Sequence, residues 1–179
     1  MTDKQFYDKQ ISGGTNDVMR LVDCLERADI AWCAIGDVAV KHWAEHSMVI
    51  LDVDFVTAAE SVERVISLLE EAGFDSEKFE CIVYFKGRSA VSFQLNTEDF
   101  YKDFSSRSVA ADVHGILLRV ASLEDTLKDK LKVLSEPQRR RSKKLKDIAD
   151  IARLVETHPH LRDELTEELR NQIQTPKDV

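Results

Sequence analysis

The sequence has little of several residue types that mark particular protein classes. Only 3 prolines and 6 glycines occur among 179 residues, which excludes collagen-like and low-complexity chains. Three widely spaced cysteines, Cys24, Cys33 and Cys81, are too few and odd in number for a disulfide framework. No apolar run approaches the ~18 residues of a membrane span, and the N-terminus has no apolar signal region. We therefore expect a cytoplasmic protein with reduced thiols and no membrane partner.

Charge is plentiful but unevenly placed. Charged residues make up 32% of the chain and the formal net charge is −8. The window 137–153 nevertheless holds seven Lys or Arg and two Asp, so that the rest of the chain carries −13. An acidic protein is a poor general binder of nucleic acid, but a local basic cluster suits a phosphate or a short stretch of RNA.

Hydrophobic periodicity predicts helices and short strands in a mixed order. Helices are expected over about 16–28, 37–46 and 57–72, strands over 31–36, 49–56, 80–85 and 90–96, and a second hairpin around His114-Gly115. From Ser122 onward the pattern is helical throughout. We predict an α/β (α+β) fold, a mixed β-sheet flanked by helices over residues 1–120, with a helical segment over 121–179 packed on it.

Two carboxylates interrupt the apolar strand 49–56. Asp52 and Asp54 are two residues apart, so their side chains share one face of a strand. Two like charges on an apolar strand repel each other, and a divalent cation such as Mg²⁺ removes that repulsion. The alternative is that they lie at a solvated strand end or pair with Lys or Arg. Upstream, Gly36 ends a strand and begins a helix, and a helix N-terminus offers N–H groups to an anion.

The run IGDVAVKHW followed by ILDVDFV resembles the minimal single-domain nucleotidyltransferases of the DNA polymerase β-like superfamily, which include abortive-infection toxin enzymes. The later segments ASLEDTLKDKLKVL and KDIADIARL also resemble them. The resemblance implies transfer of a nucleoside monophosphate from an NTP such as ATP to a hydroxyl acceptor, either RNA or a small molecule. It also implies a cognate protein partner of the toxin–antitoxin kind.

The same resemblance implies roles for particular residues. Asp52 and Asp54 would be catalytic and would hold Mg²⁺ (or Mn²⁺), the turn at Gly36 and Asp37 would contact the nucleotide phosphates, and Lys130 would reach a phosphate. The sequence departs from the family pattern at several positions, two of which concern the site. Asp37 stands where the family has a second Gly or Ser, and Gln94 stands where it has a third carboxylate. A catalytically degenerate module that binds nucleotide, RNA or protein is therefore the alternative hypothesis.

Two further motifs suggest possible binding sites, one for phosphate or RNA and one for zinc. Lys143 and Lys146 lie at the start of a predicted helix, where a cationic N-terminus would hold a triphosphate or an RNA backbone. The alternative is a solvated basic face that pairs with nearby Asp residues. His42, Glu45 and His46 spell the inverted zinc-protease motif, but no third ligand follows on a downstream helix.

Overall fold

A computed structural model describes residues 2, 4–5, 14–44 and 51–173 of the chain. The chain forms two compact units, Met1–Ser122 and Leu123–Val179, which are described separately. The sequence-based boundary of the helical segment lies two residues earlier, after residue 120. Within the described ranges, no helix has the length and apolar character needed to cross a membrane.

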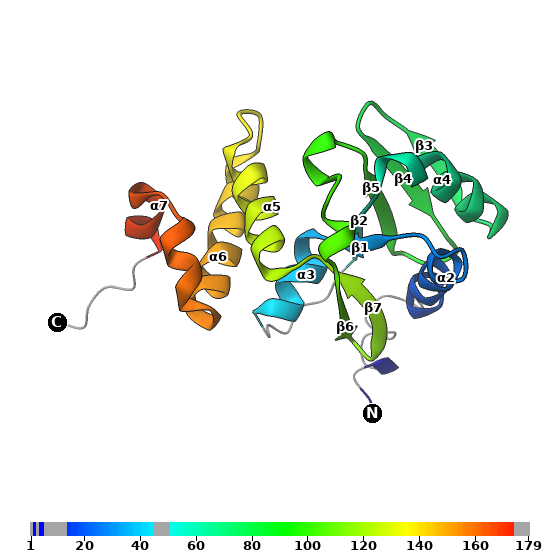
Figure 1. The fold of residues 1–179 in the computed structure, drawn as a ribbon, viewed down its shortest axis with the longest axis horizontal. Coiled ribbons are helices and arrows are strands. Elements are labelled where there is room, and N and C mark those ends of the chain that lie inside the picture. The colour runs from blue at the N-terminus through cyan, green and yellow to red at the C-terminus, as the bar shows by residue number, and fades with distance from the viewer. Residues whose placement is uncertain (1, 3, 6–13, 45–50, 174–179) are drawn as a thin grey trace. The chain divides into compact units, whose positions relative to one another are not determined.

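The first unit is built on one seven-stranded mixed sheet with the order β3-β4-β5-β2-β1-β7-β6 (Figure 1). Its strands are β1 (Trp32–Ala34), β2 (Asp52–Thr57), β3 (Asp75–Lys78), β4 (Ile82–Lys86), β5 (Ser92–Asn96), β6 (Val109–Val113) and β7 (Ile116–Val120). The pairs β2–β5 and β1–β7 are parallel and the others are antiparallel. Both predicted hairpin regions supply neighbouring strands, whereas the edge strand β3 has no counterpart among the predicted elements. The mixed sheet with flanking helices confirms the predicted fold class.

Two amphipathic helices cover one face of this sheet. They are α2 (Gly14–Arg27) and α4 (Val62–Glu71), the latter preceded by a 3₁₀ turn, η1 (Ala59–Ser61). Leu21 and Leu25 of α2 and Leu69 of α4 are buried in one apolar cluster with Phe55 of β2 and Phe93 of β5. Because side chains alternate along a strand, these core residues fix which residues of β2 and β5 point to the other face.

A smaller apolar cluster covers part of that other face. It joins Cys33, Ile35 and Val56 to Tyr101 and Phe104. These two aromatic residues come from the segment that contains the 3₁₀ turns η2 (Asp99–Tyr101) and η3 (Ser105–Arg107). Val56 lies two residues after Asp54 on the same side of β2, so the covered part of the face begins next to Asp54.

The second unit is helical. It contains α5 (Leu123–Ser135), α6 (Arg141–Thr157), the 3₁₀ helix η4 (Pro159–Glu164) and α7 (Glu167–Gln172). Helices α5 and α6 form an antiparallel hairpin whose loop contains Pro137, a residue type that interrupts helices (Figure 1). Among residues 123–173 of this unit, four aspartates are buried, and a buried lysine lies among them.

Candidate active site

Two carboxylates alternate along β2 on the face that α2 and α4 do not cover. Val53 and Phe55 are buried in the main core, whereas Asp52 is exposed and Asp54 is half-buried. Alternation places both aspartates on the opposite face of the strand. A carboxylate pair at the border between solvent and an apolar cluster is accessible to a ligand while its backbone is held rigidly.

The Gly36 turn lies against the second of these carboxylates. Helix α3 (Gly36–Trp43) begins directly after β1, and Gly36 has a φ of +58°, a backbone conformation that glycine adopts without strain. A Cβ added to Gly36 would lie 3.0 Å from Oδ2 of Asp54. The Ile35 N–H donates to the backbone oxygen of Asp54 at 2.8 Å. The predicted glycine bend and the predicted carboxylate therefore come together, 18 residues apart in sequence.

Asp37 occupies the first turn of α3. A negative charge is favoured at a helix N-terminus, so this aspartate suits the helix. It also adds negative charge beside the turn at which phosphates were expected. The prediction that Gly36 and Asp37 contact phosphate remains a prediction, and it needs backbone N–H groups rather than the Asp37 side chain to make the contact.

The neighbouring strand β5 presents neutral groups to the carboxylates. Gln94 is the register partner of Asp54, and Ser92 is the partner of Asp52. The Ser92 hydroxyl donates a short hydrogen bond to Oδ1 of Asp52. Residues that are paired in register share a face, so Gln94 lies on the same face as Asp54, and its assignment to the position of a third carboxylate remains a prediction.

The donor set on this face fits a hard divalent cation with few protein ligands. No group of three or more His, Cys, Asp or Glu side chains in the described part of the chain is arranged to hold a metal. Mg²⁺ is commonly bound by only one or two carboxylates, with waters and substrate phosphates completing its coordination. Asp52 and Asp54 meet that requirement, and the amide oxygen of Gln94 is a weaker neutral ligand beside them.

The predicted phosphate-binding lysines lie in the helical unit and differ in their surroundings. Lys130 is buried, and its Nζ lies 3.0 Å from Asp150 and 3.7 Å from Asp147. Lys146 pairs with the same Asp150 at 3.2 Å, whereas Lys143 is exposed in the first turn of α6. Lys130 thus links α5 to α6. Lys146 pairs with a nearby aspartate, as expected from the alternative of a solvated basic face.

The buried ion cluster of this unit also includes arginine. Arg139 donates to Oδ1 of Asp147 at 3.0 Å, and Arg153 pairs with Asp150 at 2.9 Å. The hydrogen bond to Asp147 raises the pKa of the Arg139 guanidinium, although burial opposes it. Every one of these contacts lies within α5, α6 and their connection, so the cluster stabilises the hairpin.

The zinc motif lies partly outside the described residues. His42 is in the last turn of α3 and stacks edge-on against Trp43. Glu45 and His46 fall in the range 45–50, which the structure does not describe. The zinc hypothesis therefore receives no structural support from the described part of the motif.

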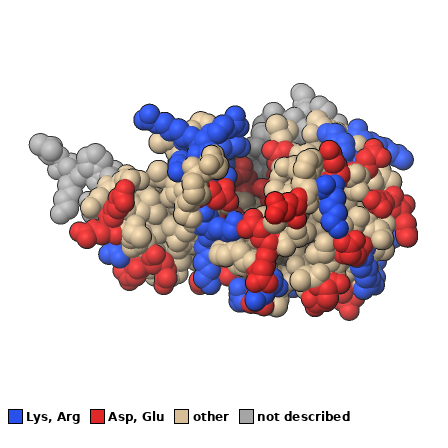
Figure 2. Space-filling view, turned by 90° about the horizontal axis from the view of Figure 1, so that it is seen from above, with Lys and Arg blue, Asp and Glu red and all other residues tan. Residues whose placement is uncertain are grey.

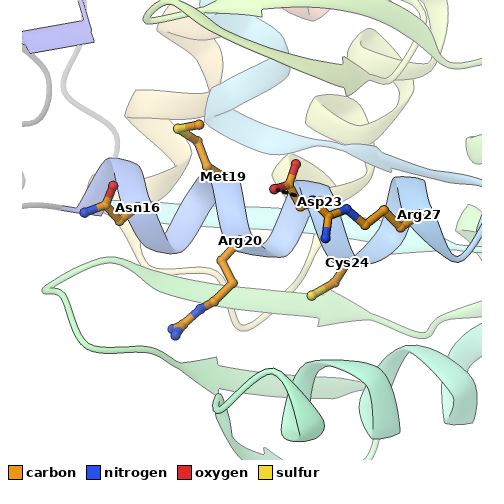
Figure 3. Close-up of a pocket in the computed structure, with 6 residues that line it drawn as sticks. All are labelled: Asn16, Met19, Arg20, Asp23, Cys24 and Arg27. Carbon is orange, nitrogen blue, oxygen red and sulfur yellow. Dashed lines mark ion pairs between the residues drawn. The ribbon is translucent and has the colours of Figure 1, made fainter.

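A shallow pocket of about 300 Å³ lies on the outer surface of α2 (Figure 3). Its lining residues are Asn16, Met19, Arg20, Asp23, Cys24 and Arg27. Burial raises the pKa of the Cys24 thiol, so this cysteine is a poor nucleophile at neutral pH. Because α2 packs on the other face of the sheet, this pocket is separate from the carboxylates.

Sequence reasoning missed three side chains on the carboxylate face. Ser92 contacts Asp52, and Tyr84 of β4 is the register partner of Gln94. Phe79 packs edge-on against Tyr84, with 5.4 Å between ring centroids. The alternation of buried Val83 and Phe85 with Tyr84 is the sequence signal that places Tyr84 on the face away from the main core.

The comparison with protein families shows which family the chain belongs to. The family model described as nucleotidyl transferase AbiEii toxin, type IV toxin–antitoxin system, matches residues 44–178. The chain belongs to the AbiEii nucleotidyltransferase family. The predicted resemblance to abortive-infection toxin nucleotidyltransferases is thereby confirmed. Membership of the AbiEii family implies an NTP substrate and a divalent metal in general, and an antitoxin as a type of partner. No curated protein matches the chain.

Solved structures show the same fold at low sequence identity. The antibiotic-resistance factor ANT(2″)-Ia, solved in complex with adenylyl-2″-tobramycin, is 11% identical, with a TM-score of 0.61 over 88% of this chain and 95% of that one. The lincosamide antibiotic adenylyltransferase LnuA, solved with lincomycin, is 13% identical, with a TM-score of 0.55 over 78% and 96%. An antigenic nucleotidyltransferase-like protein from Paracoccidioides brasiliensis is 18% identical, with a TM-score of 0.56 over 87% and 83%. These likenesses bear on the fold alone.

Proposed function

We propose that this AbiEii-family protein transfers a nucleoside monophosphate from an NTP to a hydroxyl acceptor, using Mg²⁺ held by Asp52 and Asp54. The observation that carries the proposal is the contact between the Gly36 turn and Asp54, with Asp52 on the same open face of β2. A glycine bend at a helix start beside a carboxylate pair is the arrangement that phosphoryl-transfer chemistry needs. The family assignment supports the same class of reaction.

Each residue of the site has a distinct role in this proposal. Bound Mg²⁺ would supply positive charge to the phosphates and lower the pKa of the acceptor hydroxyl. Asp52 and Asp54 would hold it, and the backbone at Gly36 would bind phosphate oxygens. In the reaction a bond forms between the acceptor oxygen and the α-phosphorus, the bond to the bridging oxygen of the β-phosphate breaks, and the acceptor hydroxyl loses its proton. Pyrophosphate leaves.

Hydrogen bonding by Ser92 would set the position of Asp52. Its hydroxyl donates to one oxygen of that carboxylate, which leaves the other oxygen for a cation. Gln94 lies beside Asp54 but cannot accept a proton from the acceptor as a carboxylate would. The proposal therefore predicts a slow enzyme in which the acceptor proton passes to solvent.

A transfer assay tests the proposal. The full chain is incubated with α-³²P-labelled NTPs, Mg²⁺ or Mn²⁺, and separate pools of RNA, protein and small alcohols. Labelled product should form with the wild type and fall at least about 100-fold in Asp54→Asn, since removing one charged group at such a site costs several kcal/mol. Asp23→Asn, an exposed change on α2, is the matched control and should keep full activity. Equal label in Asp54→Asn and wild type would refute the proposed role of Asp54.

The second candidate function is a catalytically degenerate module that binds nucleotide, RNA or protein. Gln94 in register with Asp54 is the observation that favours it. Mn²⁺-dependent NTP binding without transfer to any acceptor would support this candidate against the first. Gln94→Asp should then tighten Mn²⁺ binding, measured by isothermal titration calorimetry, because it adds a carboxylate next to Asp54. Unchanged Mn²⁺ affinity would show that position 94 does not face the metal.

The basic start of α6 is the proposed contact for RNA or a triphosphate. Arg140, Arg141 and Lys143 are exposed there, and Figure 2 shows Lys and Arg side chains gathered on one side of the helical unit. Over the sheet unit in the same view, acidic and basic side chains are intermixed. Charge reversal of Lys143 to Glu should weaken binding of an RNA oligonucleotide and reduce its salt dependence, as expected for the loss of one phosphate contact. Lys102→Glu, an exposed change in the sheet unit, is the control.

A further inference from the structure

We propose that Tyr84, supported by Phe79, is the specificity-determining residue for the acceptor, and that it binds a neutral or cationic acceptor through a planar ring. The inference rests on the proposed transferase function, because it assigns the acceptor side of that same open face. It starts from the register of three neighbouring strands, which brings Tyr84 into one row with Asp54.

The open face is ordered in rows across β2, β5 and β4. One row contains Asp54, Gln94 and Tyr84 in register, and the adjacent row contains Asp52, Ser92 and Lys86. Neighbouring strands lie about 4.8 Å apart, so the Cα atoms of Asp54 and Tyr84 are separated by roughly 10 Å. A ring stacked on Tyr84, with a hydroxyl two or three bonds away from it, would place that hydroxyl over Gln94 and beside Asp54.

Tyr84 and Phe79 are exposed although aromatic side chains usually seek burial. Tyr84 is 37% exposed and Phe79 is 52% exposed. Their rings meet at 89°, an edge-to-face geometry that stabilises the pair. An exposed ring that contacts an aromatic neighbour and lies next to a polar site is a surface on which a planar group can stack.

The charges around Tyr84 favour a cationic or neutral acceptor over a polyanion. Across the edge of the sheet, Glu77 is the register partner of Tyr84, and Asp75 is the partner of Lys86. Partners in register point to the same face, so two acidic groups and one lysine surround the ring on this side. A nucleic-acid backbone would meet net negative charge there, whereas an amine-bearing ring compound would be attracted.

Binding of a small probe tests the inference without requiring transfer. The probe is tyrosinol, which joins a planar ring, an amine and a hydroxyl, and the matched probe serinol has the amine and hydroxyls but no ring. Saturation-transfer NMR on the full chain with Mg²⁺ should detect tyrosinol and not serinol. Tyr84→Ala should weaken tyrosinol binding about tenfold or more, because it removes the ring on which the probe stacks. Tyr84→Phe should retain it.

The controls separate this inference from the transferase proposal. Leu117→Ala removes an exposed apolar side chain from β7, 70% exposed, and should leave probe binding unchanged. If tyrosinol binds through Tyr84 but no acceptor is ever labelled, the ring site stands and the transferase proposal fails. If transfer occurs and Tyr84→Ala changes neither probe binding nor the KM for the acceptor, the ring site is refuted. Tyr84-dependent binding of an RNA oligonucleotide in preference to tyrosinol would also overturn it.

Discussion

Replacing Gly87 by alanine tests the contact between Asp17 of α2 and the loop between β4 and β5. A Cβ at position 87 would lie 2.5 Å from Oδ2 of Asp17, 2.6 Å from its Cγ and 2.8 Å from Oδ1. All three distances are shorter than atoms tolerate, so the carboxylate must move. That carboxylate accepts a hydrogen bond from the Ser89 N–H at 2.7 Å and pairs with Arg20 at 2.8 Å. Gly87→Ala therefore disrupts the hydrogen bond and the ion pair of Asp17 rather than straining the backbone.

The magnitude follows from two opposing effects. Displacing a buried, charge-assisted hydrogen bond costs about 1.5–3 kcal/mol. Alanine at a glycine position returns about 0.4–1 kcal/mol by restricting the unfolded chain. Gly87→Ala should therefore lower the free energy of unfolding by about 1–2 kcal/mol. In an Asp17→Ala background the clash is gone, so the same change should be neutral or stabilising.

A double-mutant cycle in urea provides the measurement. The wild type, Gly87→Ala, Asp17→Ala and the double variant are unfolded at neutral pH, and the coupling free energy is taken from the four midpoints. Gly87→Ala should destabilise the wild type and be neutral or stabilising in the Asp17→Ala background. An equal destabilisation in both backgrounds would refute this prediction, because the cost would then have nothing to do with the carboxylate.

The same contact predicts a pH dependence. Burial raises the pKa of Asp17, but the hydrogen bonds from Ser89 and the charge of Arg20 outweigh it, so the pKa lies below its ordinary value of 3.8. The unfolded chain then binds the proton more readily than the folded one. The stabilisation is complete above pH 3.8 and is lost as the pH falls through the lower folded value. In acid titrations followed by circular dichroism, the stability advantage of the wild type over Asp17→Asn should shrink below about pH 4; a constant difference would contradict this.

The parts of the fold with strong periodicity were predictable from sequence. The apolar stripe of α2 and the Gly36 bend require only local rules, and they lie close to the predicted positions. The edge strand β3, Asp75–Lys78, escaped prediction because three of its four residues are charged and none is apolar. It forms because β4 offers a partner, which is a tertiary effect.

Only the carboxylate pair of the candidate site was predictable from the sequence. Asp52 and Asp54 stand out because charge is rare on an apolar strand. Their neighbours on β5 and β4 depend on strand order and register, which a single sequence does not specify. The contacts of Lys130 with Asp147 and Asp150 likewise depend on long-range packing that a single sequence does not specify, and its contact with a phosphate remains a prediction.

The remaining predictions concern the glycine bend and the buried lysine. Gly36→Ala should weaken Mn²⁺ binding and cost about 1–2 kcal/mol, because it adds strain at positive φ and a contact at 3.0 Å with Asp54. Gly73→Ala is the matched control, since its φ is +86° and nothing lies within 4 Å: it should cost similar stability in urea unfolding and leave calorimetric Mn²⁺ binding intact. Loss of binding in both variants would mean that strain, rather than contact with Asp54, is responsible. Lys130→Met should lower the free energy of unfolding by about 3 kcal/mol, the lower end of the range for breaking a buried ion pair, because other cations still partly neutralise the aspartates that it leaves. Lys102→Met removes a lysine that is 55% exposed and pairs with an exposed aspartate, and it should cost less than about 1 kcal/mol. Equal losses in thermal melts of the two variants would show that burial of the charge contributes nothing.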